Sequence, residues 1–149
     1  MSTDVYFDFY SRELWPFYWA YVTADNSVGP YGRDPGRPAR EAFRAKEKEL
    51  EARDGRDSHY DICRVGYLSN FVAHCNYKLW RAFERKWFRQ IVTTESIPDI
   101  LKDWDVIYQN SQKPENTEDC YMPDDIGSTA EIEEDLRAHI GFHLDIRVD

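Results

Sequence analysis

The strongest chemical signal in the sequence is the stretch 115–135, which has nine carboxylates and no lysine or arginine. Carboxylates at this density can bind a metal ion, stabilise a helix start or attract a basic partner. A calcium-binding loop needs alternating acids followed by glycine, and this spacing is absent. The dipole of a helix that begins near Ser128 explains only the last four acids. Two interpretations stay open: a solvated surface, or a docking surface for a basic protein.

We expect the docking surface, because no catalytic motif competes with it. In that interpretation the acids guide the encounter, and an aromatic ring supplies the desolvated contact. The expected partner-binding residues are Glu115, Glu118, Asp119, Tyr121, Asp124, Asp125, Glu131, Glu133, Glu134 and Asp135.

Basic side chains recur at helical spacing between residues 78 and 89, and they are the alternative site. Such a stripe can contact the phosphates of a nucleic acid. The aromatic residues Trp80, Phe83 and Trp87 fall on the opposite side of the same helix, so bases and stacking rings are not interleaved as in single-strand binding. An amphipathic helix with a basic outer face is the simpler interpretation. The alternative nucleic-acid-binding residues are Lys78, Arg81, Arg85 and Arg89.

Other chemistry has little support in the sequence. No GxSxG, P-loop or GxGxxG motif is present. Three cysteines without a CxxC pair predict reduced, buried thiols. His139 and His143 are four residues apart, but Gly141 separates them and no acid follows His139, so we expect neither a metal nor a cofactor. A small enzyme or ligand-binding domain with an aromatic pocket remains a further alternative.

The elements that position these residues begin with strands. Val5, Phe7 and Phe9 alternate with polar residues, which predicts a strand over residues 4–10. Residues 17–23 are also rich in aromatic and β-branched types, so we expect a second strand there. A turn near residues 12–13 then joins the two strands as a hairpin.

The middle of the chain is expected to be helical. Three glycines and three prolines within residues 26–38 predict a flexible loop. A charged helix follows over 40–53, with Phe43 and Leu50 as its apolar contacts. Asp57 or Ser58 can cap a long helix that runs to about residue 92, with a break near Gly66 or Asn70.

The C-terminal part combines helices, a loop and a strand. A helix begins near Ser96 and buries Ile100, Leu101 and Trp104; its end is expected as helix or as a short strand over 106–108. The acidic loop covers 109–127. Ser128 and Glu131 form a capping box for a helix that ends near Gly141, and alternating apolar residues predict a strand over 142–148.

Together these elements predict a single α+β domain over residues 1–149. Its small mixed or antiparallel sheet contains the N-terminal hairpin and the C-terminal strand, and three to four helices pack on it. The first and last strands are expected to pair. An exposed edge of this sheet allows a homodimer.

The charge is unevenly distributed along the chain. Residues 95–149 have 15 acidic and 4 basic side chains, whereas residues 1–94 have 13 and 15. This asymmetry opposes direct binding to nucleic acid or to an anionic membrane and favours a basic partner. The sequence has no apolar run of membrane-spanning length and no basic leader followed by an apolar segment, so we expect a cytoplasmic protein.

This short, acidic and aromatic-rich profile resembles that of nucleic-acid-mimicking inhibitors, which include anti-restriction and anti-CRISPR proteins of phages. The resemblance is one of composition and involves no family motif. It implies a non-enzymatic inhibitor that occupies the basic nucleic-acid-binding groove of its partner.

Overall fold

A computed structural model describes residues 4–55, 59–120 and 122–148 of the chain. The chain divides into two compact units. One unit consists of Tyr10–Asp61, and we call it the insert unit. The other consists of Met1–Phe9 and Ile62–Asp149, and we call it the sheet unit.

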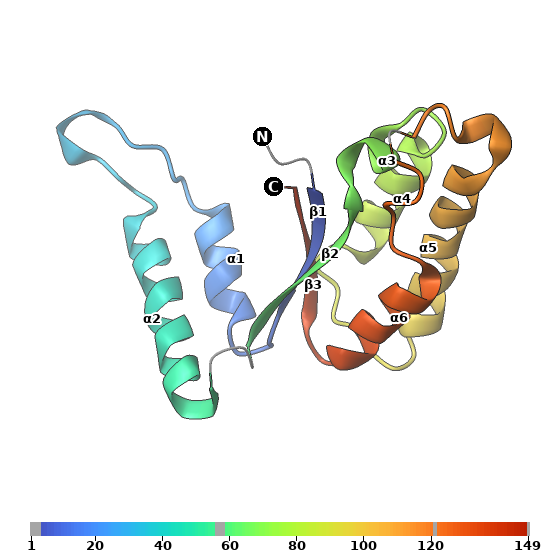
Figure 1. The fold of residues 1–149 in the computed structure, drawn as a ribbon. Helices are drawn as coiled ribbons and strands as arrows, with labels where there is room; N and C mark the ends of the chain where they lie inside the picture. The colour runs from blue at the N-terminus through green and yellow to red at the C-terminus, as the bar shows by residue number, and fades with distance from the viewer. Residues whose placement is uncertain (1–3, 56–58, 121, 149) are drawn as a thin grey trace. The chain divides into compact units, whose positions relative to one another are not determined.

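The sheet unit is built on a three-stranded antiparallel sheet with the strand order β2-β1-β3 (Figure 1). Strand β1 spans Asp4–Tyr10, β2 spans Tyr60–Tyr67 and β3 spans His143–Val148. The predicted α+β class and the pairing of the first strand with the last are confirmed. The predicted N-terminal hairpin is wrong, because β1 pairs with β2 and β3, which lie far from it in the sequence.

Four helices cover one face of this sheet (Figure 1). They are α3 (Leu68–Val72), α4 (Tyr77–Trp87), α5 (Ile97–Gln112) and α6 (Thr129–Ala138), and a short 3₁₀ helix, η2 (Pro114–Asn116), follows α5. Helix α5 packs against both α4 and α6. It therefore lies between the helix with the basic stripe and the helix with the last acids.

The core between the sheet and these helices is largely aromatic. Phe7 of β1 stacks on Phe83 of α4, with ring centroids 6.1 Å apart, and meets the edge of Trp104 of α5 at 5.4 Å. Trp80 and Trp87 are also buried, as the sequence predicts for the apolar side of this helix. The helix is thus fixed by its aromatic side, and the opposite side remains available to solvent.

The long helix predicted from residue 58 to residue 92 is wrong in its first part and confirmed over Tyr77–Trp87, the range of α4. Residues Tyr60–Tyr67 form β2, and the chain becomes helical only at Leu68. Gly66 has φ +155°, and a Cβ placed on it would lie 2.9 Å from the carbonyl oxygen of Asp125. The close backbone approach at Gly66 accompanies a bridge to Ile126, which favours an extended chain here. The predicted caps Asp57 and Ser58 lie outside the described residues.

The insert unit contains two packed helices, α1 (Trp15–Thr23) and α2 (Arg37–Asp54), and a short 3₁₀ helix, η1 (Pro30–Gly32). The strand predicted over 17–23 is therefore wrong. Pro16 occupies the first turn of α1, where its missing N–H costs nothing. The helix predicted over 40–53 is confirmed as part of α2, with Leu50 buried and Phe43 packed beside it.

Several C-terminal predictions are confirmed. Helix α5 buries Ile100 and Trp104, and it continues to Gln112, so the alternative strand over 106–108 is wrong. The Ser128 side chain accepts a hydrogen bond from the Glu131 N–H at 3.3 Å and caps α6. None of the helices in the described ranges combines the length and apolar character that a membrane crossing requires.

Candidate protein-docking surface

The acidic segment, which we define as residues 115–135, follows α5 and runs through η2 and a loop into α6. It belongs entirely to the sheet unit, which carries 18 acidic and 10 basic residues, whereas the insert unit carries 10 and 9. The charge excess of the chain therefore resides almost wholly in the sheet unit.

Most carboxylates of the acidic segment point to solvent. Six of them are exposed and form no ion pair with any residue in the described part of the chain. These six, which we call the free carboxylates, are Glu115, Glu118, Asp119, Asp124, Glu131 and Glu134.

Asp125 is different, because the Arg64 guanidinium of β2 holds its carboxylate. Arg64 Nη1 and Nη2 donate to the two carboxylate oxygens at 2.7 and 2.5 Å. Arg64 also donates to Asp4 Oδ1 at 2.9 and 2.7 Å, so a single arginine joins β1, β2 and the acidic segment. The hydrogen bonds from Arg64 lower the pKa of Asp125 below its usual value. Its charge is largely compensated within the chain.

Two further predicted residues, Glu133 and Asp135, have hydrogen-bond partners within the chain. Glu133 accepts from Arg137 Nε at 2.8 Å, one turn further along α6. Asp135 is half-buried, and its backbone oxygen accepts a hydrogen bond from His139 Nδ1 at 2.6 Å. Tyr121, the expected aromatic anchor, lies outside the described residues.

Side-chain amides hold the backbone of the acidic segment against the helices. Asn70 Nδ2 donates to the carbonyl oxygens of Met122 and Asp125 at 2.7 and 3.0 Å, and Gln112 Nε2 donates to Pro123 O at 2.5 Å. Trp104 Nε1 donates to Gly127 O at 2.8 Å. These bonds add to the backbone bonds of the loop, in which Asp125 N donates to Met122 O at 2.8 Å and Tyr67 N of β2 donates to Asp125 O at 3.1 Å. The segment is therefore held in place along its length and not only at its ends.

The segment also borders a hollow of about 480 Å³, lined by Arg64, Met122, Pro123, Asp124 and Asp125. Met122 is 44% exposed and gives the hollow an apolar wall beside the carboxylates. An apolar wall next to negative charge suits the side chain of an arginine or lysine, whose stem is apolar and whose end is charged.

The basic stripe is exposed as the sequence predicts. Lys78, Arg81 and Arg85 are exposed on α4, and Arg89 is exposed just beyond its end. The guanidinium of Arg89 lies 4.6 Å from the centre of the Phe88 ring. Three of these cations line a hollow of about 320 Å³: Arg81, Arg85 and Arg89, together with Glu84 and Phe88.

Glu84 moderates the charge of this hollow. Its carboxylate lies 3.6 Å from Arg81 Nη1. Burial raises the pKa of Glu84, and the charge of Arg81 opposes that rise. An ion pair between α4 and α5 involves a residue outside the basic stripe: Lys86 Nζ lies 3.0 Å from the Asp103 carboxylate of α5.

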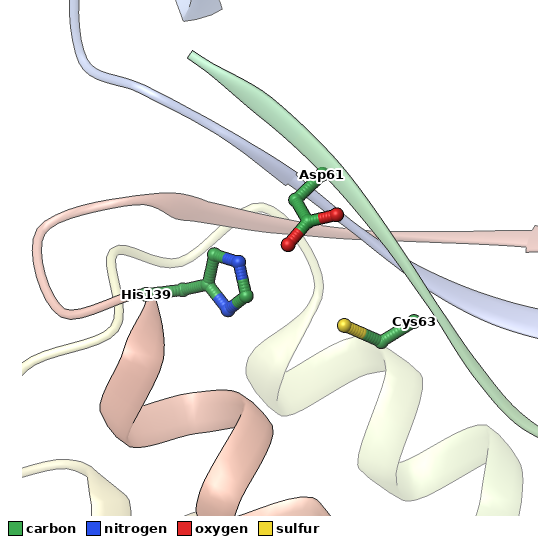
Figure 2. Close-up of side chains that lie close together, drawn as sticks. All are labelled: Asp61, Cys63 and His139. Carbon is green, nitrogen blue, oxygen red and sulfur yellow. The ribbon is translucent and has the colours of Figure 1, made fainter. Parts of the chain in front are cut away.

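The structure also brings together a cysteine and a histidine that the sequence did not connect. Figure 2 shows Cys63 on β2 and His139 at the end of α6; Cys63 Sγ and a ring nitrogen of His139 lie within 4.8 Å of each other. The same figure labels Asp61, two residues before Cys63 on β2. His139 is buried and stacks on Phe9, with centroids 4.0 Å apart.

This pair offers two donors of the kind that zinc prefers, one sulfur and one nitrogen, whereas a structural zinc site takes four. His139 and His143, which the sequence analysis disfavoured as a metal-binding pair, have separate partners: His139 Nδ1 lies 2.6 Å from Asp135 O, and His143 Nδ1 lies 3.0 Å from Arg89 O. The sequence analysis missed the Cys63–His139 pair because it placed residues 60–67 in a helix. A correct strand prediction would have placed Cys63 in the sheet.

The comparisons with known proteins give no relatives: no family model matches the chain, and neither a curated protein nor a solved structure is significantly similar to it.

Proposed function

We propose that the protein is a non-enzymatic binding protein whose acidic segment docks on a basic surface of another protein. The observation that carries this proposal is the set of six free carboxylates on a backbone held by side-chain hydrogen bonds from Asn70 and Trp104. Exposed like charges repel one another and destabilise the chain that carries them. A partner with lysines and arginines relieves that repulsion on binding.

The held backbone favours docking over a merely solvated surface. A preorganised segment loses little conformational entropy on binding, so more of the interaction free energy contributes to affinity. The hollow beside Met122 provides a place where one basic side chain of the partner is desolvated. The surrounding carboxylates then guide the encounter and make it sensitive to salt.

The kind of partner follows from the same chemistry. Surfaces that bind nucleic acid carry the clustered arginines and lysines that an acidic segment complements. We infer that the protein occupies such a groove and blocks it, as anti-restriction and anti-CRISPR inhibitors of phages do; this inference rests on composition and on the exposed carboxylates.

The test reverses three of the free carboxylates, in the variant Glu118→Lys, Asp119→Lys, Asp124→Lys. Asp125 is left intact because its pairing with Arg64 supports the fold. The matched control, Glu41→Lys, Glu49→Lys, Glu51→Lys, makes the same change in net charge on exposed positions of α2. We expect roughly 100-fold weaker binding for the first variant and little change for the control. Equal affinities for both variants would remove the proposal.

A second candidate function is the binding of nucleic acid by the basic stripe. The specific observation in its favour is that Arg81, Arg85 and Arg89 line one hollow beside the Phe88 ring, which suits a phosphate next to a base. Retention of the unmodified protein on labelled DNA or RNA at low salt, lost when Lys78, Arg81, Arg85 and Arg89 are replaced by alanine, supports this candidate. No retention at low salt rejects it.

A further inference from the structure

Two of the three cysteines lie side by side in the sheet unit. Cys75 Sγ and Cys120 Sγ are 3.7 Å apart, although 45 residues separate them in the sequence. Cys75 lies in the turn between α3 and α4, and Cys120 ends the turn that follows η2. The sequence, which lacks a CxxC pair, gave no indication of this contact.

A hydrogen-bond network holds the backbone at Cys75 and connects it to the acidic segment. Asn110 Nδ2 donates to Cys75 O at 2.6 Å and to Asn76 Oδ1 at 3.1 Å. Asn116 Nδ2 donates to Asn110 O at 3.0 Å, which ties the start of the acidic segment to the same network. The sulfur contact is therefore part of a hydrogen-bonded junction between α3, α4 and the acidic segment.

The geometry is close to that of a disulfide. A disulfide has sulfur atoms about 2.05 Å apart, so the two thiols must approach by less than about 2 Å. Both residues are in turns rather than inside a helix or strand. A rotation of the side chains with a small backbone adjustment is enough for this approach.

The two thiols differ in accessibility. Cys75 is half-buried and lines a hollow of about 470 Å³ with Val72, His74, Tyr77 and Lys78. Cys120 is 3% exposed, and its burial, together with the hydrogen bond with Cys75, raises the pKa of the Cys120 thiol. An oxidant from solvent therefore reaches Cys75 first, and Cys120 is placed to react with the product.

We propose that Cys75 and Cys120 are an intramolecular disulfide-forming pair that responds to peroxide. The Cys75 thiol releases its proton, and the thiolate attacks one oxygen of hydrogen peroxide. The O–O bond breaks, the other oxygen leaves as hydroxide and takes up that proton to become water, and Cys75 becomes a sulfenic acid. The Cys120 sulfur then attacks the Cys75 sulfur, loses its proton, and the sulfenic hydroxyl leaves as water. In total, two thiols and one peroxide give one disulfide and two waters.

The bond links the α3–α4 turn to the segment that bears Glu118 and Asp119. It closes a long loop of the chain, which restricts the unfolded state and raises the melting temperature of the oxidised protein by about 5–10 °C. The proposed bond is independent of the proposed docking function.

The experiment treats the full-length protein with hydrogen peroxide and counts free thiols, then maps the cross-link by mass spectrometry of peptides. We expect one free thiol, a Cys75–Cys120 peptide pair and the higher melting temperature, all reversed by a thiol reductant. Cys63→Ser is the matched control and should form the same bond, whereas Cys75→Ser and Cys120→Ser should not form it.

Three outcomes overturn the proposal: all three thiols remain, Cys63 joins the cross-link, or Cys75 is oxidised to sulfinic acid without a cross-link. Peptide mapping of the peroxide-treated protein without substitutions distinguishes these outcomes, even if a serine variant fails to fold.

Discussion

The side-chain amide of Asn70 exchanges two hydrogen bonds with the backbone of Met122. Its Nδ2 donates to Met122 O at 2.7 Å, and its Oδ1 accepts from Met122 N at 3.3 Å. Asn70 is fully buried in the middle of α3. The amide thus adds to the pairing of this loop with β2, in which Tyr67 N donates to Asp125 O and Gly127 N donates to Val65 O. It holds the part of the chain that bears the exposed Met122 and Asp124.

Replacement of Asn70 by alanine is expected to lower the free energy of unfolding by about 2 kcal/mol. The substitution removes three hydrogen bonds: those from Asn70 Nδ2 to the carbonyl oxygens of Met122 and Asp125, and the one from the Met122 N–H to Asn70 Oδ1. The two carbonyl oxygens keep their backbone donors, whereas the Met122 N–H loses its bond to Asn70. Urea denaturation measures the change. Gln109→Ala, an exposed amide on α5, is the control and should change stability by less than about 0.5 kcal/mol. A change in Asn70→Ala as small as in the control would contradict this role.

Replacement of Arg64 by methionine is expected to destabilise the sheet unit by about 1 kcal/mol at neutral pH, because the charges are partly exposed. The pKa of Asp125 in the folded protein is lower than its usual value of 3.8. A lowered folded-state pKa stabilises the protein above the unfolded-state pKa, and this contribution is lost as the pH falls through the folded-state pKa.

The stability difference between the parent protein and Arg64→Met should therefore be constant from neutral pH to about pH 5 and shrink below pH 3.8. Chemical denaturation across this range checks the expectation. A difference that stays constant into strong acid shows that Arg64 acts through packing and not through the ion pair.

Asp8 and Arg147 form an ion pair between the neighbouring strands β1 and β3, in which the aspartate is buried and the arginine is partly exposed. Arg147 Nε lies 3.1 Å from Asp8 Oδ2, and the Asp8 side chain is only 2% exposed. Replacement of Arg147 by methionine should lower the free energy of unfolding by about 3 kcal/mol, because a buried charge loses its counterion. Adding Asp8→Asn in the double variant should restore part of the loss. A double variant that is less stable than Arg147→Met would argue against the charge pair.

Ser128 is expected to contribute about 1 kcal/mol through its cap on α6. Ser128→Ala should lose this amount, while Ser128→Asp, which can also accept from the Glu131 N–H, should retain most of it. Thermal denaturation of the three proteins measures the order. If aspartate is no better than alanine, the side-chain hydrogen bond does not stabilise the helix.

The elements that were predicted correctly are those whose structure is decided by residues close together in the sequence. The Ser128–Glu131 capping box lies next to its own helix, and residues 143–148 alternate strictly between apolar and polar types. Helix α5 has Pro98 in its first turn and buries Trp104 at the expected spacing. In each case, the residues that decide the structure lie within a few positions of one another.

The wrong assignments depend on distant contacts. Residues 60–67 form a strand because they pair with β1 and because Gly66 approaches Asp125, and neither partner is adjacent in the sequence. Residues 17–23 bear aromatic rings on several sides, so the apolar pattern does not distinguish a strand from α1. Likewise, the exposure of Asp119 and Asp124 agrees with the docking interpretation. The pairing of Asp125 with Arg64 could not be predicted, because 61 residues separate the two in the sequence.

The most direct test of the account is affinity capture from cytosol, at low and high salt, with the parent protein and the two charge-reversal variants as bait. We expect the parent and the α2 control to retain the same basic, nucleic-acid-binding protein, high salt to release it, and the Glu118, Asp119 and Asp124 reversal not to retain it. Retention of the same protein by the reversed variant, or loss by both variants alike, rules out docking through the free carboxylates.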